Sequence, residues 1–288
     1  MKIKFYGTAA VDGVPALFCK CRVCEKSRAD GGKNIRTRSQ ACIDNTLLID
    51  LPPDTYMHAV VGGLPLQDIE HCLITHSHFD HLIPEELDIR TAYCVAEVSH
   101  GFTVYGTEKV RAALGNRLCD NAFLERVGFS LIEPFVPFTA AGYEITPLAA
   151  DHEAASGPVI FLIEKDGKTL LYGNDTGYFP EDTWHWFETA RPRLDLAAFD
   201  CTFGNRPGMR RNHMNLQTVM EVRDRLEKMG CVHAGTKNYL NHICHNSWTT
   251  HDELVQLAAP CGFTVAYDGL ETEISNAEKN MARVIVKH

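Results

Sequence analysis

The chain has 288 residues, of which 45% are hydrophobic and 23% charged, and its formal net charge at pH 7 is −9. This composition is typical of a folded globular protein, and the length is sufficient for a large buried core. The net negative charge argues against broad contact with a nucleic-acid backbone, because such contact is usually made by clustered Lys and Arg. No apolar run is long enough for a membrane helix and no signal-peptide core follows the start, so we expect a cytoplasmic protein with no membrane partner.

Short apolar runs that end in polar residues predict strands over the first two thirds of the chain. These runs lie at residues 2–7, 46–50, 71–76, 102–106, 143–152 and 196–200. Residues 159–175 consist of two alternating runs joined by Asp166-Gly167, a pair that favours a tight hairpin turn. Several of these strands therefore deliver an Asp or a His at their carboxyl ends.

Helices are clearest late in the sequence. Apolar residues keep a 3.6-residue period from Leu216 to Met229, and Gly230 suits a helix end. His251 to Ala259 has a similar pattern, and the less regular stretch 84–100 is also interpreted as helical. Strand groups with helices between them predict sheets that are covered by helices on their outer faces.

The segment THSHFDHL at 75–82 carries the strongest chemical signal. His76, His78, Asp80 and His81 fall within six positions, directly after an apolar strand. An extended strand would point alternate side chains to opposite faces, whereas a loop at its end can direct all four to one place. Imidazole and carboxylate ligands suit Zn, Mn, Fe or Ni, so the segment predicts a site for two divalent ions. The alternative is a solvated loop that is rich in His.

Two ions need more ligands than this loop supplies. His152, Asp175 and His242 each lie at or just beyond the end of a predicted strand. Each is a candidate ligand, and Asp175 has the charge to bridge two cations. On sequence alone, residues of this kind are more often hydrogen-bonded structural residues than ligands.

A second cluster lies in FCKCRVCEK at 18–26. Eleven cysteines in a chain without a signal peptide favour thiols or metal ligands over disulfides. Cys19, Cys21 and Cys24 place three thiols in one tight loop, and a closed structural zinc site needs a fourth ligand. We select His245, although another distant Cys or His, or three free thiols, are alternatives.

Other polar residues are predicted to support such a site. Asp50 and Asp54 are expected either to accept the second ring N–H of metal-binding histidines or to cap loops. Arg210 and Arg211 are expected to hold a substrate phosphate or to form a solvated surface. The three tryptophans are expected to pack in the core or on helix faces: Trp184, Trp186 and Trp248.

These residues resemble a known family. THSHFDH resembles the H-x-H-x-D-H signature of the metallo-β-lactamase superfamily, and His152, Asp175 and His242 follow in its usual order. GVPALFCKC with Cys24, together with NHICH at 241–245, is most similar to the phosphoribosyl cyclic phosphodiesterases associated with carbon–phosphorus lyase operons. The similarity extends over nearly the whole chain.

The resemblance implies an α/β fold, a four-layer αββα sandwich in which two mixed, mostly antiparallel sheets are flanked by helices. It implies a single domain over 1–288, with a Cys-rich structural zinc loop at about 14–40. One active-site ion would bind His76, His78 and His152, and the other would bind Asp80, His81 and His242, with Asp175 bridging them. The implied structural zinc ligands are Cys19, Cys21, Cys24 and His245.

The expected function is a phosphodiesterase that cleaves a small cyclic or nucleotide-like phosphodiester. Two cations would activate a shared water, and the resemblance assigns proton donation to His213, which is grouped with Asp80 as catalytic. Residues 82–100 lack a glycine found in relatives and 203–212 is rich in Arg and Gly, so the particular phosphodiester stays open. A homodimer also stays open.

Three alternatives remain. One is a metal-dependent oxidase similar to the B protein of pyrroloquinoline quinone biosynthesis, and another is a tRNA 3′-end endonuclease, which the acidic charge disfavours. The third is a metal-stabilised binding module without catalysis. The complete ligand set disfavours this module, because the cysteine site alone would provide stability.

Overall fold

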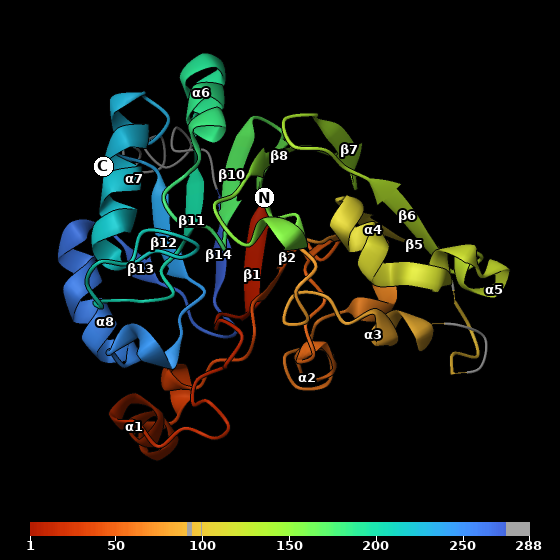
Figure 1. Cartoon of the computed structure of the whole chain (residues 1–288), viewed down its shortest axis with the longest axis horizontal. Helices are drawn as coiled ribbons and strands as arrows, with labels where there is room; N and C mark the ends of the chain where they lie inside the picture. Colours follow the sequence, from red (N-terminus) through yellow and green to blue (C-terminus); the bar gives the residue numbers. More distant parts are fainter. Residues whose placement is uncertain (91–93, 99, 275–288) are drawn as a thin grey trace, which may run out of the picture.

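The structure is a computed structural model that describes residues 1–90, 94–98 and 100–274. Two seven-stranded mixed sheets form its centre, and helices cover their outer faces (Figure 1). The predicted αββα sandwich is therefore confirmed. None of the helices in the described residues is long and apolar enough to cross a membrane.

The first sheet has the strand order β14-β1-β2-β3-β4-β5-β6. Its strands are β1 (Lys2–Gly7), β2 (Gln40–Ile43), β3 (Leu47–Ile49), β4 (His71–Leu73), β5 (Phe102–Gly106), β6 (Val127–Leu131) and β14 (Glu271–Glu273). Strands β3 to β6 run parallel to one another. Their carboxyl ends therefore share one edge of the sheet.

The second sheet has the order β13-β12-β11-β10-β9-β8-β7. Its strands are β7 (Phe138–Ala140), β8 (Tyr143–Ala149), β9 (Val159–Lys165), β10 (Lys168–Gly173), β11 (Leu196–Asp200), β12 (Lys237–Asn241) and β13 (Thr264–Val265). Strands β10 to β13 are parallel, and β8 has the same direction because it and β10 are both antiparallel to β9. The expected hairpin at 159–175 is present as β9 and β10.

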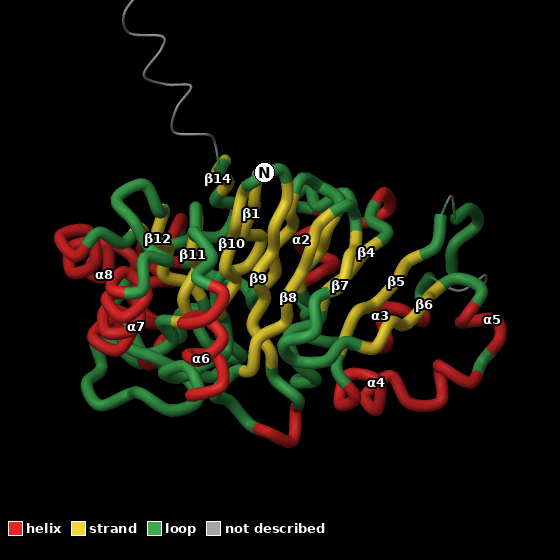
Figure 2. Tube along the Cα trace, turned by 90° about the horizontal axis from the view of Figure 1, so that it is seen from above, coloured by secondary structure: helices red, strands yellow, loops and turns green. Residues whose placement is uncertain are grey.

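Eight α-helices occur in the described residues. They are α1 (Arg22–Asp30), α2 (Thr55–Val60), α3 (Pro84–Asp88), α4 (Glu108–Leu114), α5 (Asn121–Leu124), α6 (Glu181–Ala190), α7 (Leu216–Lys228) and α8 (His251–Ala258). The sheets lie between the helices in the view from above (Figure 2). In α7 the Asn215 side chain accepts a hydrogen bond from the Thr218 N–H at 2.9 Å, which caps the first turn.

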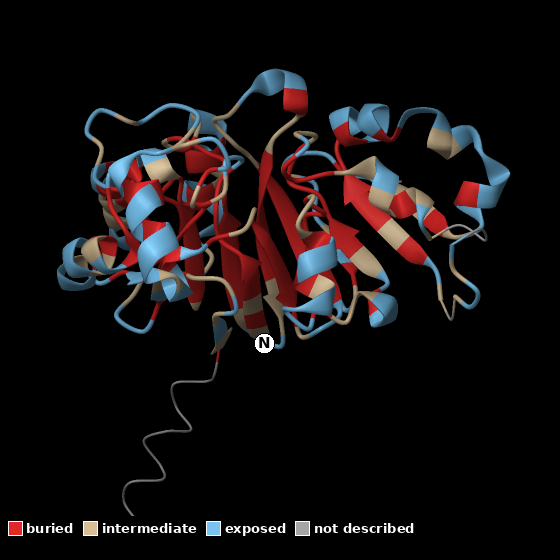
Figure 3. Cartoon of the chain, turned by 90° about the horizontal axis from the view of Figure 1, so that it is seen from below, coloured by how far each residue is buried: buried red, intermediate tan, exposed pale blue. Residues whose placement is uncertain are grey.

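Three apolar layers hold the sandwich together. The inner layer joins the two sheets through residues such as Phe5 and Phe161. A second layer packs α6, α7 and α8 on the second sheet, and a third packs α2 to α5 on the first. The strands are accordingly buried, while the outward helix faces are exposed (Figure 3).

Three sequence predictions differ from the structure. The helix expected at 84–100 is limited to Pro84–Asp88, and residues 91–93 and 99 of that range lie outside the described residues. Trp184 is fully buried as expected, but Trp248 is 57% exposed and does not pack in the core. The stretch 14–40 is not wholly a loop, because α1 begins at Arg22, directly after two of the cysteines.

Candidate metal centre

The loop after β4 presents four candidate ligands at the shared strand edge. Its backbone turns tightly, since the His81 and Leu82 N–H groups both donate to the His78 carbonyl, at 3.0 and 2.9 Å. His76 and His81 are each only 1% exposed and Asp80 only 6%, whereas His78 is half-buried. The turn directs the four side chains inward, which the alternating geometry of a strand would not allow.

Three histidines converge from two strand ends. The His76 Nε2 atom lies 2.9 Å from His78 Nδ1, which lies 3.2 Å from His152 Nε2. His152 follows β8, so the contact joins the edges of the two sheets. One nitrogen from each ring lies within 4.8 Å of the others, close enough for the three rings to bind one ion.

Asp175, which follows β10, lies between this group and a second one. Its Oδ2 atom is 3.1 Å from His81 Nε2 and 3.0 Å from His242 Nε2, and its Oδ1 atom is 4.0 Å from His152 Nε2. His81 Nε2 is also 3.3 Å from Asp80 Oδ2. Asp80, His81 and His242 form a second group of donors within 4.8 Å of one another.

Three residues at this edge adopt left-handed backbone conformations. Asp50, Asp175 and His242 have φ values of +67°, +51° and +59°. Such values are uncommon for residues other than glycine, and they cluster where function fixes a side chain. Here each follows a strand end, and the reversed backbone brings the side chain back over the edge.

Buried carboxylates hold the rings from behind. The His81 Nδ1 atom lies 2.8 Å from Asp50 Oδ2, so the expectation that Asp50 orients a histidine is confirmed. The same expectation is wrong for Asp54, which instead accepts hydrogen bonds from the Arg38 backbone N–H and guanidinium.

Asp200 is the main site residue that the sequence reading missed. It ends β11, is fully buried, and its Oδ2 atom lies 3.0 Å from His213 Nδ1 and 3.4 Å from His242 Nδ1. Its place in LAAFD, at the end of a buried strand, is the signal that would have found it. Glu153 was missed as well, and its Oε2 atom is 2.7 Å from His78 Nε2.

The electrostatics around Asp175, in the second donor group, favour positive charge. Burial alone would raise the pKa of Asp175, but His242 and His81 hold it well below its usual range. Burial alone would lower the pKa of His81, but Asp175, Asp50 and Asp80 raise it well above its ordinary value. Carboxylates packed against imidazoles therefore create a buried anionic environment of the kind that binds cations.

The donor atoms also fit a cation. Asp175 Oδ2 and His242 Nε2 have no surface accessible to solvent and no hydrogen-bond partner among the described residues, although they lie 3.0 Å apart. Buried polar atoms are usually hydrogen-bonded, and a metal ion would satisfy both of these. The residues present therefore suit divalent ions bound by nitrogen and oxygen.

His213 and the two neighbouring arginines lie at the rim. The His213 ring stacks on His242 with centroids 5.5 Å apart and contacts His152 edge-on at 4.9 Å. Arg210 pairs with Glu221 on α7 and lies over the Tyr178 ring, and the Arg211 Nε atom donates to both Asp151 carboxylate oxygens at 3.0 and 2.9 Å. Both arginines therefore have acidic partners within the protein.

The cysteine cluster also converges on its expected fourth residue. Cys19 Sγ and Cys21 Sγ lie 3.6 and 3.5 Å from His245 Nδ1, and Cys24 Sγ completes a group whose atoms are all within 4.8 Å. Burial would raise the pKa of the Cys21 thiol, but hydrogen bonds from the Cys24 backbone and His245 lower it to about 6. A thiol that readily becomes a thiolate suits a metal site.

The fold and the donor set together indicate the class of protein: an αββα sandwich that binds metal ions at one edge of its two sheets. The chain belongs to the beta-lactamase superfamily, since residues 45–242 match the Beta-lactamase superfamily domain.

Two proteins of known sequence are similar over 95% of this chain. The Porphyromonas gingivalis octanoyltransferase is 26% identical, and the match covers 52% of its length, so the chain spans about half of that relative. The coenzyme PQQ synthesis protein B of Methylorubrum extorquens is 23% identical, and the match covers all of it.

Solved structures share the fold. The zinc-bound PqqB of Methylobacterium extorquens aligns with a TM-score of 0.71 and 21% identity over 95% of this chain and 100% of that one. A diphosphatase from the PhnP family aligns with a TM-score of 0.69 and 20% identity over 95% and 98%. The short form of human tRNase Z aligns with a TM-score of 0.61 and 15% identity over 96% and 100%.

Proposed function

We propose that the protein is a metal-dependent hydrolase, and specifically a phosphodiesterase that cleaves a small cyclic or nucleotide-like phosphodiester. The observation that carries the proposal is the convergence of two donor groups, one partly and one fully buried, on Asp175 at the shared edge of the two sheets. A structural role for one ion would not require a second donor group beside the first.

The ligand assignment follows the two donor groups. His76, His78 and His152 would hold one divalent ion, and Asp80, His81 and His242 would hold the other, with Asp175 between the two groups. Ions bound there would supply an activated water and neutralise phosphoryl oxygens as negative charge develops. Asp50 and Asp200 fix the ring orientations from outside this set.

His213 is the proposed proton donor. Its Nδ1 atom is held 3.0 Å from Asp200 Oδ2, which leaves Nε2 as the nitrogen that transfers a proton. When the bond between phosphorus and the leaving oxygen breaks, the alkoxide takes that proton. Asp200 is a positioning residue, because it fixes the ring through Nδ1 and stabilises the imidazolium form.

A structural zinc on Cys19, Cys21, Cys24 and His245 completes the proposal. His245 lies three residues after His242, so one short segment would connect the cysteine loop to the active-site edge. The Arg22 guanidinium supports this docking by donating to both Glu253 carboxylate oxygens, at 2.7 and 3.0 Å. Removal of this zinc is expected to lower stability first and activity only as a consequence.

The phosphodiester assignment is supported by the sequence resemblance and by the shared fold of a diphosphatase from the PhnP family. The test is metal analysis together with hydrolysis of bis(p-nitrophenyl) phosphate and of 2′,3′- and 1,2-cyclic phosphates. We expect His76→Ala to abolish hydrolysis and His213→Ala to lower kcat by about 100-fold, within the range for general acids. His185→Ala on the exposed side of α6 is the matched control and should retain full activity. Hydrolysis that survives His76→Ala would refute the proposed centre, whereas unchanged kcat in His213→Ala would refute only the proton donor.

A second candidate is a metal-dependent oxidase. The end-to-end match to coenzyme PQQ synthesis protein B favours it. Purified protein that contains one redox-active iron and hydrolyses none of the phosphodiesters would support the oxidase. The octanoyl transfer named for the other relative is not assigned to this chain, because half of that relative lies outside the match.

A further inference from the structure

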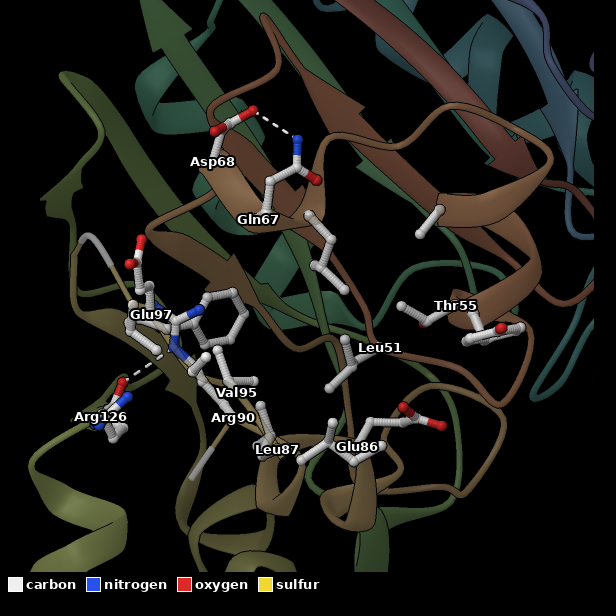
Figure 4. A pocket seen from close by; sticks show the side chains of 17 residues that line it. Leu51, Thr55, Gln67, Asp68, Glu86, Leu87, Arg90, Val95, Glu97 and Arg126 are labelled. Atoms are coloured by element: carbon white, nitrogen blue, oxygen red, sulfur yellow. Dashed lines mark hydrogen bonds between the residues drawn. The ribbon is translucent and has the colours of Figure 1, made fainter. Parts of the chain in front are cut away.

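A cavity of about 1050 Å³ lies on the outer face of the first sheet (Figure 4). Among the described residues it is bounded by α2, α3, residues 95–98 and the start of β5. None of its lining residues belongs to the candidate metal ligands. Leu51 separates the two sites, since its N–H donates to the His81 carbonyl at 2.7 Å while its side chain lines the cavity.

Most of the cavity wall is apolar. The lining includes Leu66, Leu87, Val98 and Phe102, of which Leu87 and Phe102 are each only 3% exposed. This volume is slightly above the roughly 300–1,000 Å³ usual for small-molecule sites and leaves room for a long hydrocarbon chain. An apolar wall of this extent favours a ligand with a substantial apolar part.

Two arginines lie together at one side of this cavity (Figure 4). The Arg90 Nε atom donates to the Arg126 carbonyl at 3.2 Å, and its Nη2 atom donates to the His100 carbonyl at 2.5 Å, which fixes the guanidinium beside the Phe102 ring. The Arg126 Nη1 atom is inaccessible to solvent and has no hydrogen-bond partner among the described residues. Burial and the charge of Arg126 both lower the pKa of Arg90.

The positive charges of Arg90 and Arg126 lie beside an apolar wall. This combination favours a ligand that has both an anionic head group and a hydrocarbon tail. Within the described residues neither arginine forms an ion pair with a carboxylate, although Asp68, Glu86 and Glu97 also line the cavity. Asp68 is bonded to Gln67 at 2.8 Å, and both lie away from the arginines (Figure 4). The planar guanidinium fork matches a carboxylate in geometry as well as in charge.

We propose that this cavity binds a medium- or long-chain aliphatic carboxylate, with its head group on Arg126 and Arg90 and its tail against Leu66, Leu87 and Phe102. The head group is the anionic partner that the two guanidinium groups lack among the described residues. The tail covers the apolar wall below α2 and α3. This binding does not depend on the activity of the metal centre.

The test is calorimetric titration of the full-length, metal-loaded protein with decanoate. Acetate is the probe without a tail, decyltrimethylammonium has the opposite charge, and decyl phosphate distinguishes a phosphate head group from a carboxylate. We expect saturable one-site binding of decanoate and no binding of acetate or decyltrimethylammonium at the same concentration. Decyl phosphate that binds at least tenfold more tightly than decanoate would overturn the carboxylate head group.

Variants locate the site. Arg126→Met should weaken decanoate binding at least tenfold, and Leu66→Trp, which fills the cavity, should abolish it. The control Arg111→Met, on the exposed surface of α4, should leave the affinity within twofold. Thermal melts show whether each variant is folded. If Arg126→Met does not fold, Leu66→Trp still tests the site. Absence of saturable binding, unchanged affinity in Leu66→Trp, or displacement of decanoate by inorganic phosphate at the metal centre would each overturn the proposal.

Discussion

Asp200 offers the sharpest test of how the site is built, because one fully buried carboxylate accepts five hydrogen bonds. Its Oδ1 atom accepts from the Thr202 and Met214 N–H groups, both at 3.0 Å. Its Oδ2 atom accepts from the Asp175 N–H at 3.1 Å, the Thr202 hydroxyl at 3.0 Å and His213 Nδ1 at 3.0 Å. The change Asp200→Asn keeps the shape but replaces one acceptor oxygen by a donor.

The expected cost follows from the donors that lose their acceptor. If the amide oxygen takes the place of Oδ1, the NH₂ group faces the Asp175 N–H and His213 Nδ1, while the Thr202 hydroxyl can rotate away. Each buried donor left unpaired costs about 1–3 kcal/mol, so the free energy of unfolding should fall by about 4 kcal/mol. Because the same change releases the His213 ring, kcat should also fall while KM changes little.

The assay is urea unfolding followed by circular dichroism, combined with hydrolysis of bis(p-nitrophenyl) phosphate. The matched control is Asp166→Asn in the β9–β10 turn, where φ is +51° and Asn tolerates that conformation. It should shift stability by less than about 0.5 kcal/mol. If Asp200→Asn costs less than about 1 kcal/mol, the buried network does not have the strength inferred from these contacts.

The other predictions concern separate parts of the molecule. Cys19→Ser should remove one zinc equivalent and lower the melting temperature, whereas Cys94→Ser, at an exposed thiol, should change neither; equal zinc contents would contradict the proposed structural site. His251 accepts a hydrogen bond from Arg36 Nη2 at 2.8 Å, and burial together with the Arg36 charge lowers its pKa to about 4. The folded state therefore keeps His251 neutral while the unfolded chain takes up a proton below about pH 6.5, so up to about 3 kcal/mol of stability is lost as pH falls from 6.5 to 4. Urea titrations should show a shallower decline for His251→Asn, and parallel pH curves would refute this origin. A Cβ at Gly7 would meet the Arg38 carbonyl oxygen at 1.9 Å, so Gly7→Ala should lower the free energy of unfolding in urea by about 2 kcal/mol or more. Gly101→Ala should be nearly neutral, because a Cβ there would meet no atom of the described residues within 4 Å apart from its chain neighbours.

The sequence alone determined the parts that depend on local order. The period of apolar residues located most strands and the late helices, and the spacing from His76 to His81 required a loop at a strand end. The resemblance of that loop to a known signature then predicted the αββα fold, which the structure confirms. Such features can be predicted because alternation and helical period act between residues a few positions apart.

Only the tertiary structure decided which distant groups meet. Asp50 and Asp54 look equivalent in the sequence, yet only Asp50 reaches a site histidine, because β3 lies beside β4 while Asp54 turns towards Arg38. Asp200 depends in the same way on β11 lying between β10 and β12. The same holds for the cavity beside Leu51. There the Arg90 guanidinium donates a hydrogen bond to the Arg126 carbonyl, 36 residues further along the chain. Strand order and burial set these contacts, and neither property is encoded in the spacing of residues along the chain.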